Sequence, residues 1–226
     1  MVQRLKWNLA GLFILVPLLS LGQQQDLQLW TRTSLKYDLN KKSRIYIEEE
    51  LRFKNNIRHL SKLHTELGWR QKLSKQWKIS GYYRLTNLRD SKGYFENRHR
   101  LSLQATWQPP VNILNFWISP RLQYTWHDFS RSPDWRIPEK YFRCEAGVSK
   151  KSINGKFEPH ADVEAWYALR TGTVNIIDQY RLTLGLEYKI DRNRRWDFFY
   201  RYQQEIQVND PLTAYIVGVA YTYLIR

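Results

Sequence analysis

The chain has 226 residues, a formal net charge of +15, 15% aromatic residues and a mean hydropathy of −0.62. So polar an average excludes a membrane protein built from many apolar helices, and it suits a β-barrel, whose strands give a weak hydropathy signal. The basic charge alone would also fit a nucleic-acid-binding protein, but we disfavour that class because the N-terminus directs the chain out of the cytoplasm.

Residues 1–22 are predicted to be a secretory signal peptide. A positively charged start precedes a short apolar core at 9–21, and Ser20 and Gly22 supply the small residues of a cleavage site. The core is too short for a comfortable membrane span, although a retained N-terminal anchor is the alternative. We therefore expect an exported protein whose residues 23–226 form one outer-membrane β-barrel domain.

Most of the chain alternates apolar and polar residues with a period of two, in segments bounded by turn residues. In the last segment, for example, Tyr215, Val217 and Val219 alternate with Gly218 and Ala220. The alternating segments are 27–37, 44–54, 62–73, 77–88, 96–107, 116–127, 140–149, 157–167, 180–188, 196–206 and 214–226. This pattern of alternating segments separated by turn residues is typical of membrane-spanning β-strands.

Eleven segments make an awkward count, because bacterial single-chain barrels use an even number of strands. We predict an all-β fold, a transmembrane antiparallel up-and-down β-barrel of about twelve strands. Either residues 23–30 fold back as an extra short strand, or one of the eleven segments has been wrongly split or merged. About ten strands is the fallback. Two residues break the pattern. Pro120 suggests a bulge, and Glu49, which places a charge on the apolar phase, suggests a bulge or a register error.

Aromatic residues fall at both ends of the apolar phase, where a barrel in lipid needs two aromatic girdles. One predicted girdle contains Tyr37, Trp77, Trp107, Phe116, Phe157, Tyr188, Trp196 and Tyr223, and the other contains Phe53, Trp126, Tyr167, Tyr180, Tyr202 and Tyr215. A soluble β-sandwich is the rival fold. The girdles favour the barrel, as does the rule that no sheet edge stays unpaired in lipid.

The polar phase predicts the residues that line the lumen, and it carries charges of both signs. These residues are Glu48, Glu50, Arg52, Glu66, Arg70, Arg84, Arg98, Arg100, Arg121, Arg143, Glu145, Glu158, Asp162, Glu164, Arg181, Glu187 and Arg201. We interpret them as groups that pair across a charged, largely filled lumen, which gives a structural or narrow-pore role. A passive channel for small anions is the alternative.

A membrane-embedded hydrolase is a third class of function. Asn97 and His99 share the outward phase, but Ser80 and Ser102 on the flanking strands face inward, so no nucleophile accompanies them. Cys144 is interpreted as a small buried hydrophobe. We predict no catalytic residues, no cofactor and no metal site, since the histidines form no close pair or acidic cluster.

The ending of the chain carries a spacing, Gly218-x-x-Tyr221-x-Tyr223, that resembles the terminal signal by which outer-membrane barrels are recognised for insertion. We expect outer-membrane lipid and the barrel-insertion machinery as partners, no nucleic acid, and a monomer.

Several runs along the mature chain also carry a family resemblance. They are Leu29–Trp30, Tyr37–Phe53, Glu96–Leu103, Tyr180–Ile190, Phe198–Glu205 and the ending YIVGVAYTY. The chain resembles an uncharacterised family of Gram-negative outer-membrane barrels that is known only as a domain of unknown function. The resemblance implies the location and the barrel fold, and it brings no established activity or functional residues.

Overall fold

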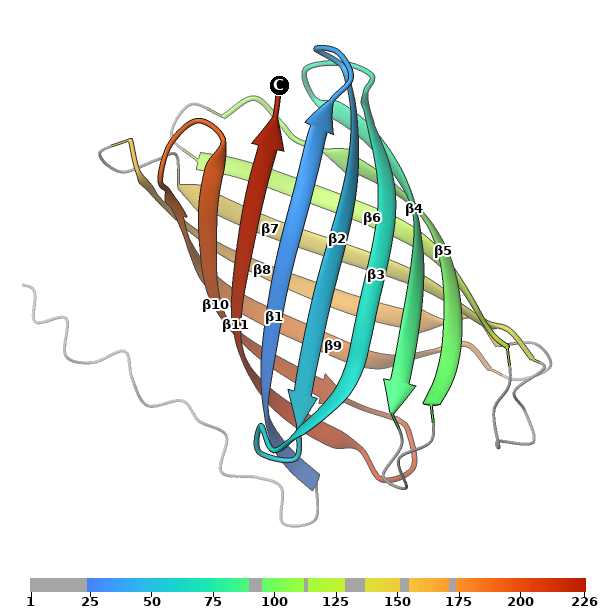
Figure 1. Ribbon diagram of the computed structural model, residues 1–226. Coiled ribbons are helices and arrows are strands. Elements are labelled where there is room, and N and C mark those ends of the chain that lie inside the picture. The colour runs from blue at the N-terminus through green and yellow to red at the C-terminus, as the bar shows by residue number, and fades with distance from the viewer. Residues whose placement is uncertain (1–23, 90–94, 112–113, 129–136, 151–154, 171–173) are drawn as a thin grey trace, which may run out of the picture.

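The computed structural model describes residues 24–89, 95–111, 114–128, 137–150, 155–170 and 174–226 (Figure 1). The predicted signal peptide lies outside these residues. Within the described residues, no helix is long and apolar enough to cross a membrane.

The described chain folds into one closed sheet of eleven β-strands. The strands are β1 (Gln24–Asp38), β2 (Ser43–Lys54), β3 (His59–Lys72), β4 (Trp77–Arg89), β5 (Phe95–Trp107), β6 (Leu114–His127), β7 (Glu139–Lys150), β8 (Phe157–Ala168), β9 (Ile176–Lys189), β10 (Arg194–Glu205) and β11 (Leu212–Ile225). The predicted all-β barrel is confirmed, and a sandwich of two sheets is excluded. The prediction of an extra fold-back strand is wrong, because Gln24–Trp30 continue directly into the rest of β1.

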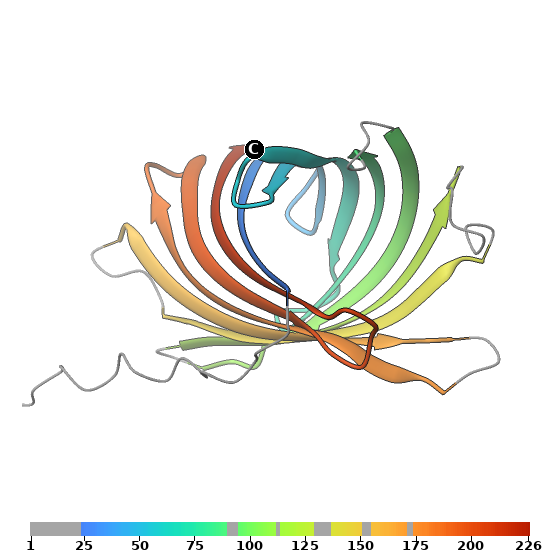
Figure 2. The same cartoon turned by 90° about the horizontal axis from the view of Figure 1, so that it is seen from below.

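The barrel closes through a parallel pair, which we call the seam. Strands β1 and β11 run in the same direction side by side, from Gln24 opposite Leu212 to Tyr37 opposite Ile225 (Figure 1). All other neighbouring strands are antiparallel. An odd number of strands in an up-and-down order leaves the first and last strand parallel, so the seam follows from the count of eleven. Figure 2 shows the ring of strands from below.

The polarity of the two faces of the sheet is the reverse of that in a water-soluble protein. Large apolar side chains lie exposed on the outer face, as with Leu103 at 58% and Leu184 at 64% exposure. Small polar side chains are buried on the inner face, as with Ser34 at 1% and Thr183 at 2%. A folded chain that hides its hydroxyl groups and displays its leucines is suited to an apolar surrounding.

The outward aromatic residues occupy the ends of the strands as the sequence predicts. At the barrel end that holds the C-terminus, Trp77 and Trp107 lie directly opposite each other on β4 and β5, with ring centroids 6.5 Å apart and the rings tilted by 39°. At the opposite end, Tyr202 lies between Tyr180 and Tyr215, at 6.1 and 5.8 Å. The apolar outer wall is therefore bordered by aromatic rings at both ends.

Four inner-face glycines each lie under a ring from the directly opposite residue of the neighbouring strand. The pairs are Gly68 with Tyr46, Gly147 with Trp117, Gly185 with His160, and Gly218 with Phe199. A Cβ atom added to any of these glycines would stand 2.0 to 2.2 Å from the ring. Glycine is thus required so that the ring can lie flat on the backbone, an arrangement that also stabilises curved sheets.

The residues expected to disturb the sheet behave differently from the prediction. Pro120 causes no register shift and lies opposite Cys144, although it interrupts the pairing of β6 with β5. Register shifts occur instead after Arg52 on β2 and after Trp166 on β8. Cys144 is partly exposed rather than buried.

Glu49 is in register on the outer face of β2. It lies directly between Thr33 of β1 and Thr65 of β3, and the Thr65 hydroxyl donates a hydrogen bond of 3.0 Å to its carboxylate. The charge therefore has a local polar partner, and no bulge or register error explains it.

Gly218→Val tests the requirement for a bare backbone under Phe199. The Phe199 ring belongs to a buried cluster with Trp30, Ala214 and Ile216, so moving it would disturb that packing. We expect the substitution to lower the free energy of unfolding by about 1–3 kcal/mol in urea titrations of the detergent-solubilised protein. Gly81→Val is the matched control, because the nearest atom to an added Cβ there is 4.0 Å away. Equal stability of the two variants would contradict the packing argument.

Candidate functional site: the charged inner face

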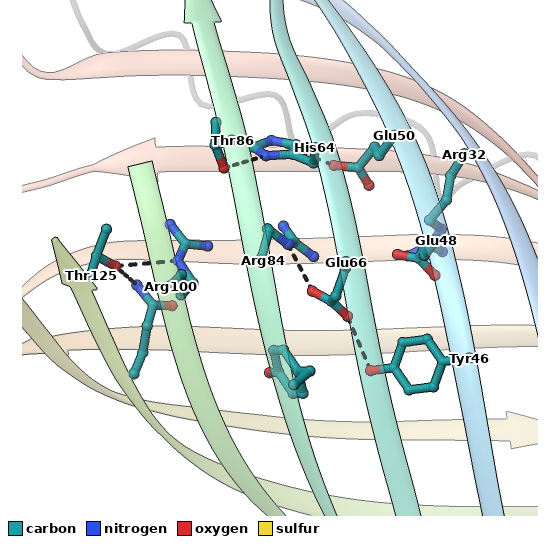
Figure 3. Close-up of polar contacts among 12 residues, drawn as sticks. Arg32, Tyr46, Glu48, Glu50, His64, Glu66, Arg84, Thr86, Arg100 and Thr125 are labelled. Atoms are coloured by element: carbon teal, nitrogen blue, oxygen red, sulfur yellow. Dashed lines mark hydrogen bonds and ion pairs between the residues drawn. The ribbon is translucent and has the colours of Figure 1, made fainter. Parts of the chain in front are cut away.

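The inner face of β2 to β4 carries several ion pairs. Glu66 accepts a hydrogen bond from Arg84 Nε at 2.7 Å and another from the Tyr46 hydroxyl at 3.0 Å (Figure 3). On the same face Arg52 pairs with Glu50 at 2.5 Å. Charged side chains in a buried interior of low dielectric constant need such partners, because removing one partner of a buried ion pair strongly destabilises the folded protein.

Glu164 is the centre of a second group on β6 to β9. Its Oε1 lies 2.7 Å from Arg143 Nη2 and 3.8 Å from Arg121 Nη1, and its Oε2 lies 3.3 Å from Arg181 Nη1. Glu164 is only 3% exposed. Strands β6 and β8 are not neighbours in the sheet, so the contact of Arg121 with Glu164 passes over β7 on the concave side. One carboxylate thus holds three guanidinium groups together inside the barrel.

Two tryptophans place further guanidinium groups within the interior. The Cζ of Arg52 lies 3.5 Å from the ring centroid of Trp30, and those of Arg181 and Arg201 lie 5.3 and 5.4 Å from it. The ring of Trp166 lies 4.3 Å from Arg143 and 4.5 Å from Arg181. These are cation–π distances. Because β10 and β11 separate β9 from β1, the contact of Arg181 with Trp30 makes the interior narrow at this level.

Several inner-face cations lack a carboxylate at salt-bridge distance among the described residues: Lys36, Lys62, Arg70, Arg100 and Arg201. Arg100 Nε donates only to Thr125 Oγ1 at 3.3 Å, and Arg201 Nε only to Thr183 Oγ1 at 3.0 Å. In the same described part, Arg181 Nε is buried without a hydrogen-bond partner. The inner face therefore holds five cations without a direct carboxylate contact, while Glu145 and Asp162 are carboxylates of the same face without a cation at that distance in the described chain.

The other predicted lumen residues form local pairs. Arg98 pairs with Glu96, Glu158 with Lys189, and Glu187 with Arg195, while Glu48 lies 3.6 Å from Arg32 and Glu145 accepts from Trp117 Nε1 at 2.7 Å. Asp162 lies on β8 opposite Gly147 and Thr183. The predicted set left out Trp30, Trp166, Arg32, Lys36 and Lys62. All five share the polar phase of their strands, so they would have been found if tryptophan and every cation on that phase had been counted as lumen residues.

His99 lies on the outer face within a polar group that contains no serine among the described contacts. Its Nδ1 is 2.5 Å from the Tyr83 hydroxyl and its Nε2 is 2.7 Å from Asp128. Ser80 and Ser102 are buried, as the inward phase predicts. Within the described residues, no three His, Cys, Asp or Glu side chains gather into a group able to hold a metal ion.

The closed sheet, the apolar outer face and the charged inner face define a β-barrel of porin-like fold. In its structure the chain is similar to a NanC porin, with a TM-score of 0.51 and 16% sequence identity over 78% of this chain and 86% of that one. At that identity the likeness shows the fold alone. The chain belongs to the family described as "Protein of unknown function (DUF2490)", which matches residues 27–211. No curated protein matches the chain in sequence. The resemblance to an uncharacterised barrel family is thereby confirmed.

Glu164→Gln tests the role of the shared carboxylate. The change removes the charge that Arg143 and Arg181 contact directly, and it leaves buried guanidinium groups without compensation. We expect a loss of about 3 kcal/mol in the free energy of unfolding, measured by urea titration in detergent. Glu187→Gln is the matched control, because Glu187 contacts Arg195 near the barrel end, where both side chains are more exposed. A loss no larger than that of the control would contradict the central role of Glu164.

Proposed function

We propose that this protein is an outer-membrane barrel that gives small anions a narrow passage. The observation that carries the proposal is the set of inner-face cations, Arg100 and Arg201 above all, that have no carboxylate at salt-bridge distance in the described chain. Fixed guanidinium groups in a confined interior attract anions and repel cations, which is how arginine-lined pores obtain their preference. The unpartnered Nε of Arg181 adds a donor to the same interior.

The membrane location is supported by the outer surface. Exposed leucines cover the wall, aromatic rings border it at both ends, and the closed sheet leaves no unpaired edge along its strands. These are the requirements that a hydrocarbon surrounding places on a β-protein. Export by residues 1–22 and insertion guided by Gly218, Tyr221 and Tyr223 belong to the same proposal, as do the barrel-insertion machinery as a partner and a monomeric state. We assign no chemical reaction to the protein.

A closed barrel with a purely structural role is the second candidate. It is favoured by the contacts that cross the interior, in particular the three guanidinium groups around Trp30. The two candidates differ in one measurable property, since a plugged barrel inserts into a bilayer without conducting.

The double variant Arg100→Gln, Arg201→Gln tests the anion passage. In planar bilayers under a salt gradient, we expect the unaltered protein to give steps with an anion-selective reversal potential. Removing two unpaired positive charges should reduce the ratio of anion to cation permeability several-fold. Arg192→Gln is the control, because Arg192 lies in the turn between β9 and β10 and not on the inner face. Insertion without current would contradict the passage and favour the structural role.

Glu49→Leu tests whether the wall over β1 to β3 meets lipid. A carboxylate at mid-depth on a lipid face is unfavourable, although less so than a lysine or arginine. We expect the variant to gain about 1 kcal/mol in the free energy of unfolding in phosphatidylcholine vesicles, measured by urea titration. Thr65→Val is the control for the lost hydrogen bond. A clear loss of stability on removing Glu49 would indicate that protein, and not lipid, covers this part of the wall.

A further inference from the structure

A basic pocket lies at the barrel end that holds the C-terminus. Its volume is about 590 Å³, and its polar lining residues are Lys42, Lys72, Ser74, Lys75, Lys78 and Gln108. Backbone hydrogen bonds join the segments that form it. Lys72 N donates to Lys42 O at 2.8 Å, and Gln108 N donates to Gln76 O at 2.8 Å. The end of β3 is thereby tied to the β1–β2 turn, and the end of β5 to the β3–β4 turn.

The strand register turns two of these lysines toward the interior of the barrel. Lys72 and Lys78 lie directly opposite each other on β3 and β4, and the next inner-face pair along the two strands is Arg70 with Ser80. Ser80 is only 6% exposed. Since side chains alternate between the two faces of a sheet, Lys72 and Lys78 share the inner phase of Arg70 and Ser80. The pocket therefore belongs to the mouth of the barrel and not to its apolar outer wall.

The pocket concentrates positive charge. Among the described residues, none of its four lysines has a carboxylate at salt-bridge distance, and no acidic side chain lines it. Lys42, Lys72 and Lys75 are exposed, whereas Lys78 is partly buried and donates a hydrogen bond to the Gln108 side chain. Like charges held around one hollow repel one another, so an anion that contacts several of them relieves that repulsion.

A nearby carboxylate does not cancel this charge. Asp38, the last residue of β1, interacts electrostatically with Lys72, but Arg44 Nε and Nη2 already donate to its carboxylate at 2.5 and 3.1 Å. Arg70 lies two residues before Lys72 on β3, which is about 7 Å along a strand, and it adds a further cation of the inner phase. The positive charge therefore continues from the pocket into the mouth of the barrel.

We propose that this pocket binds a water-soluble anion that carries several phosphate groups, an oligophosphate, with Lys42, Lys72, Lys75 and Lys78 as its ligands. Each ammonium group offers three donors, and phosphate oxygens accept charge-assisted hydrogen bonds from them. The volume is within the usual range of small-molecule sites, roughly 300–1,000 Å³, which is more than a single phosphate ion fills. A dissolved anion fits this position, because the inner phase meets the barrel mouth and not the lipid-facing wall. The site goes beyond the anion passage and does not depend on a conducting lumen.

The lysines are tested by isothermal titration of tripolyphosphate into the detergent-solubilised full chain at an ionic strength of about 0.15 M, where charges more than about 8 Å apart are largely screened. The test variant is Lys42→Gln, Lys72→Gln, Lys75→Gln. The control is Lys150→Gln, Lys156→Gln, Arg192→Gln, which removes the same charge from other turns at the same end of the barrel. We expect one bound tripolyphosphate in the unaltered protein and the control, and an affinity about tenfold weaker in the test variant.

A pair of single variants repeats the test within one turn. Lys41 and Lys42 are neighbours in the β1–β2 turn, and only Lys42 lines the pocket. We expect Lys42→Gln to weaken tripolyphosphate binding several-fold and Lys41→Gln to leave it unchanged. This pair gives a result even if the triple variant does not fold.

Two further arms define the ligand. Affinity should rise from inorganic phosphate to pyrophosphate to tripolyphosphate, because each added phosphate can reach another lysine. Phosphatidylglycerol at the same phosphate concentration should not displace tripolyphosphate. Equal affinity in the two triple variants, equal effects of Lys41→Gln and Lys42→Gln, equal affinity for phosphate and tripolyphosphate, or displacement by phosphatidylglycerol would each overturn the proposal. None of these outcomes depends on whether the lumen conducts.

Discussion

Pairing of the backbone across the seam is the constraint on which the rest of the structure depends. In an apolar surrounding every backbone amide and carbonyl must find a partner within the protein, so a sheet has to close on itself. Eleven strands in up-and-down order bring β1 and β11 together in parallel, and their register runs without interruption from Gln24 to Tyr37. Because the sheet is closed, alternate residues of every strand face either the outside or the interior of the barrel. The exposed leucines, the aromatic bands and the buried charges all follow from this alternation.

The interior shows how a small barrel accommodates many charges. Carboxylates such as Glu164 are shared between several guanidinium groups, and the indole ring of Trp30 lies under others. The rings of Phe199 and Tyr46 lie on glycines of the same inner face. Arg100 and Arg201 are not paired in this way, since each donates from Nε to a threonine hydroxyl. These guanidinium groups link the packing of the interior to its proposed preference for anions.

The alternation of residues was sufficient to predict the wall, because the two-residue period places each side chain on one face whatever the neighbouring strand is. All eleven strands and both aromatic bands could be found in this way. The number of strands was not predicted correctly, because the rule that bacterial barrels have an even number of strands was preferred to the direct count of eleven segments. Periodicity also carries no information on whether β1 and β11 pair in parallel. Pairs such as Arg121 with Glu164, or His160 over Gly185, could not be predicted either, since they depend on the register between strands, which alternation alone does not give.

The measurement that tests the parallel seam most directly is disulfide formation across it. In a Cys144→Ala background, the pair Thr31→Cys, Val219→Cys joins residues that lie directly opposite each other on β1 and β11, within reach of a disulfide. The pair Thr31→Cys, Val217→Cys is shifted by two residues and serves as the control. The seam predicts rapid cross-linking of the first pair under mild oxidation and little of the second, read on a denaturing gel after membrane extraction. Absence of the first cross-link, or equal cross-linking of both pairs, would contradict an eleven-stranded barrel closed in parallel.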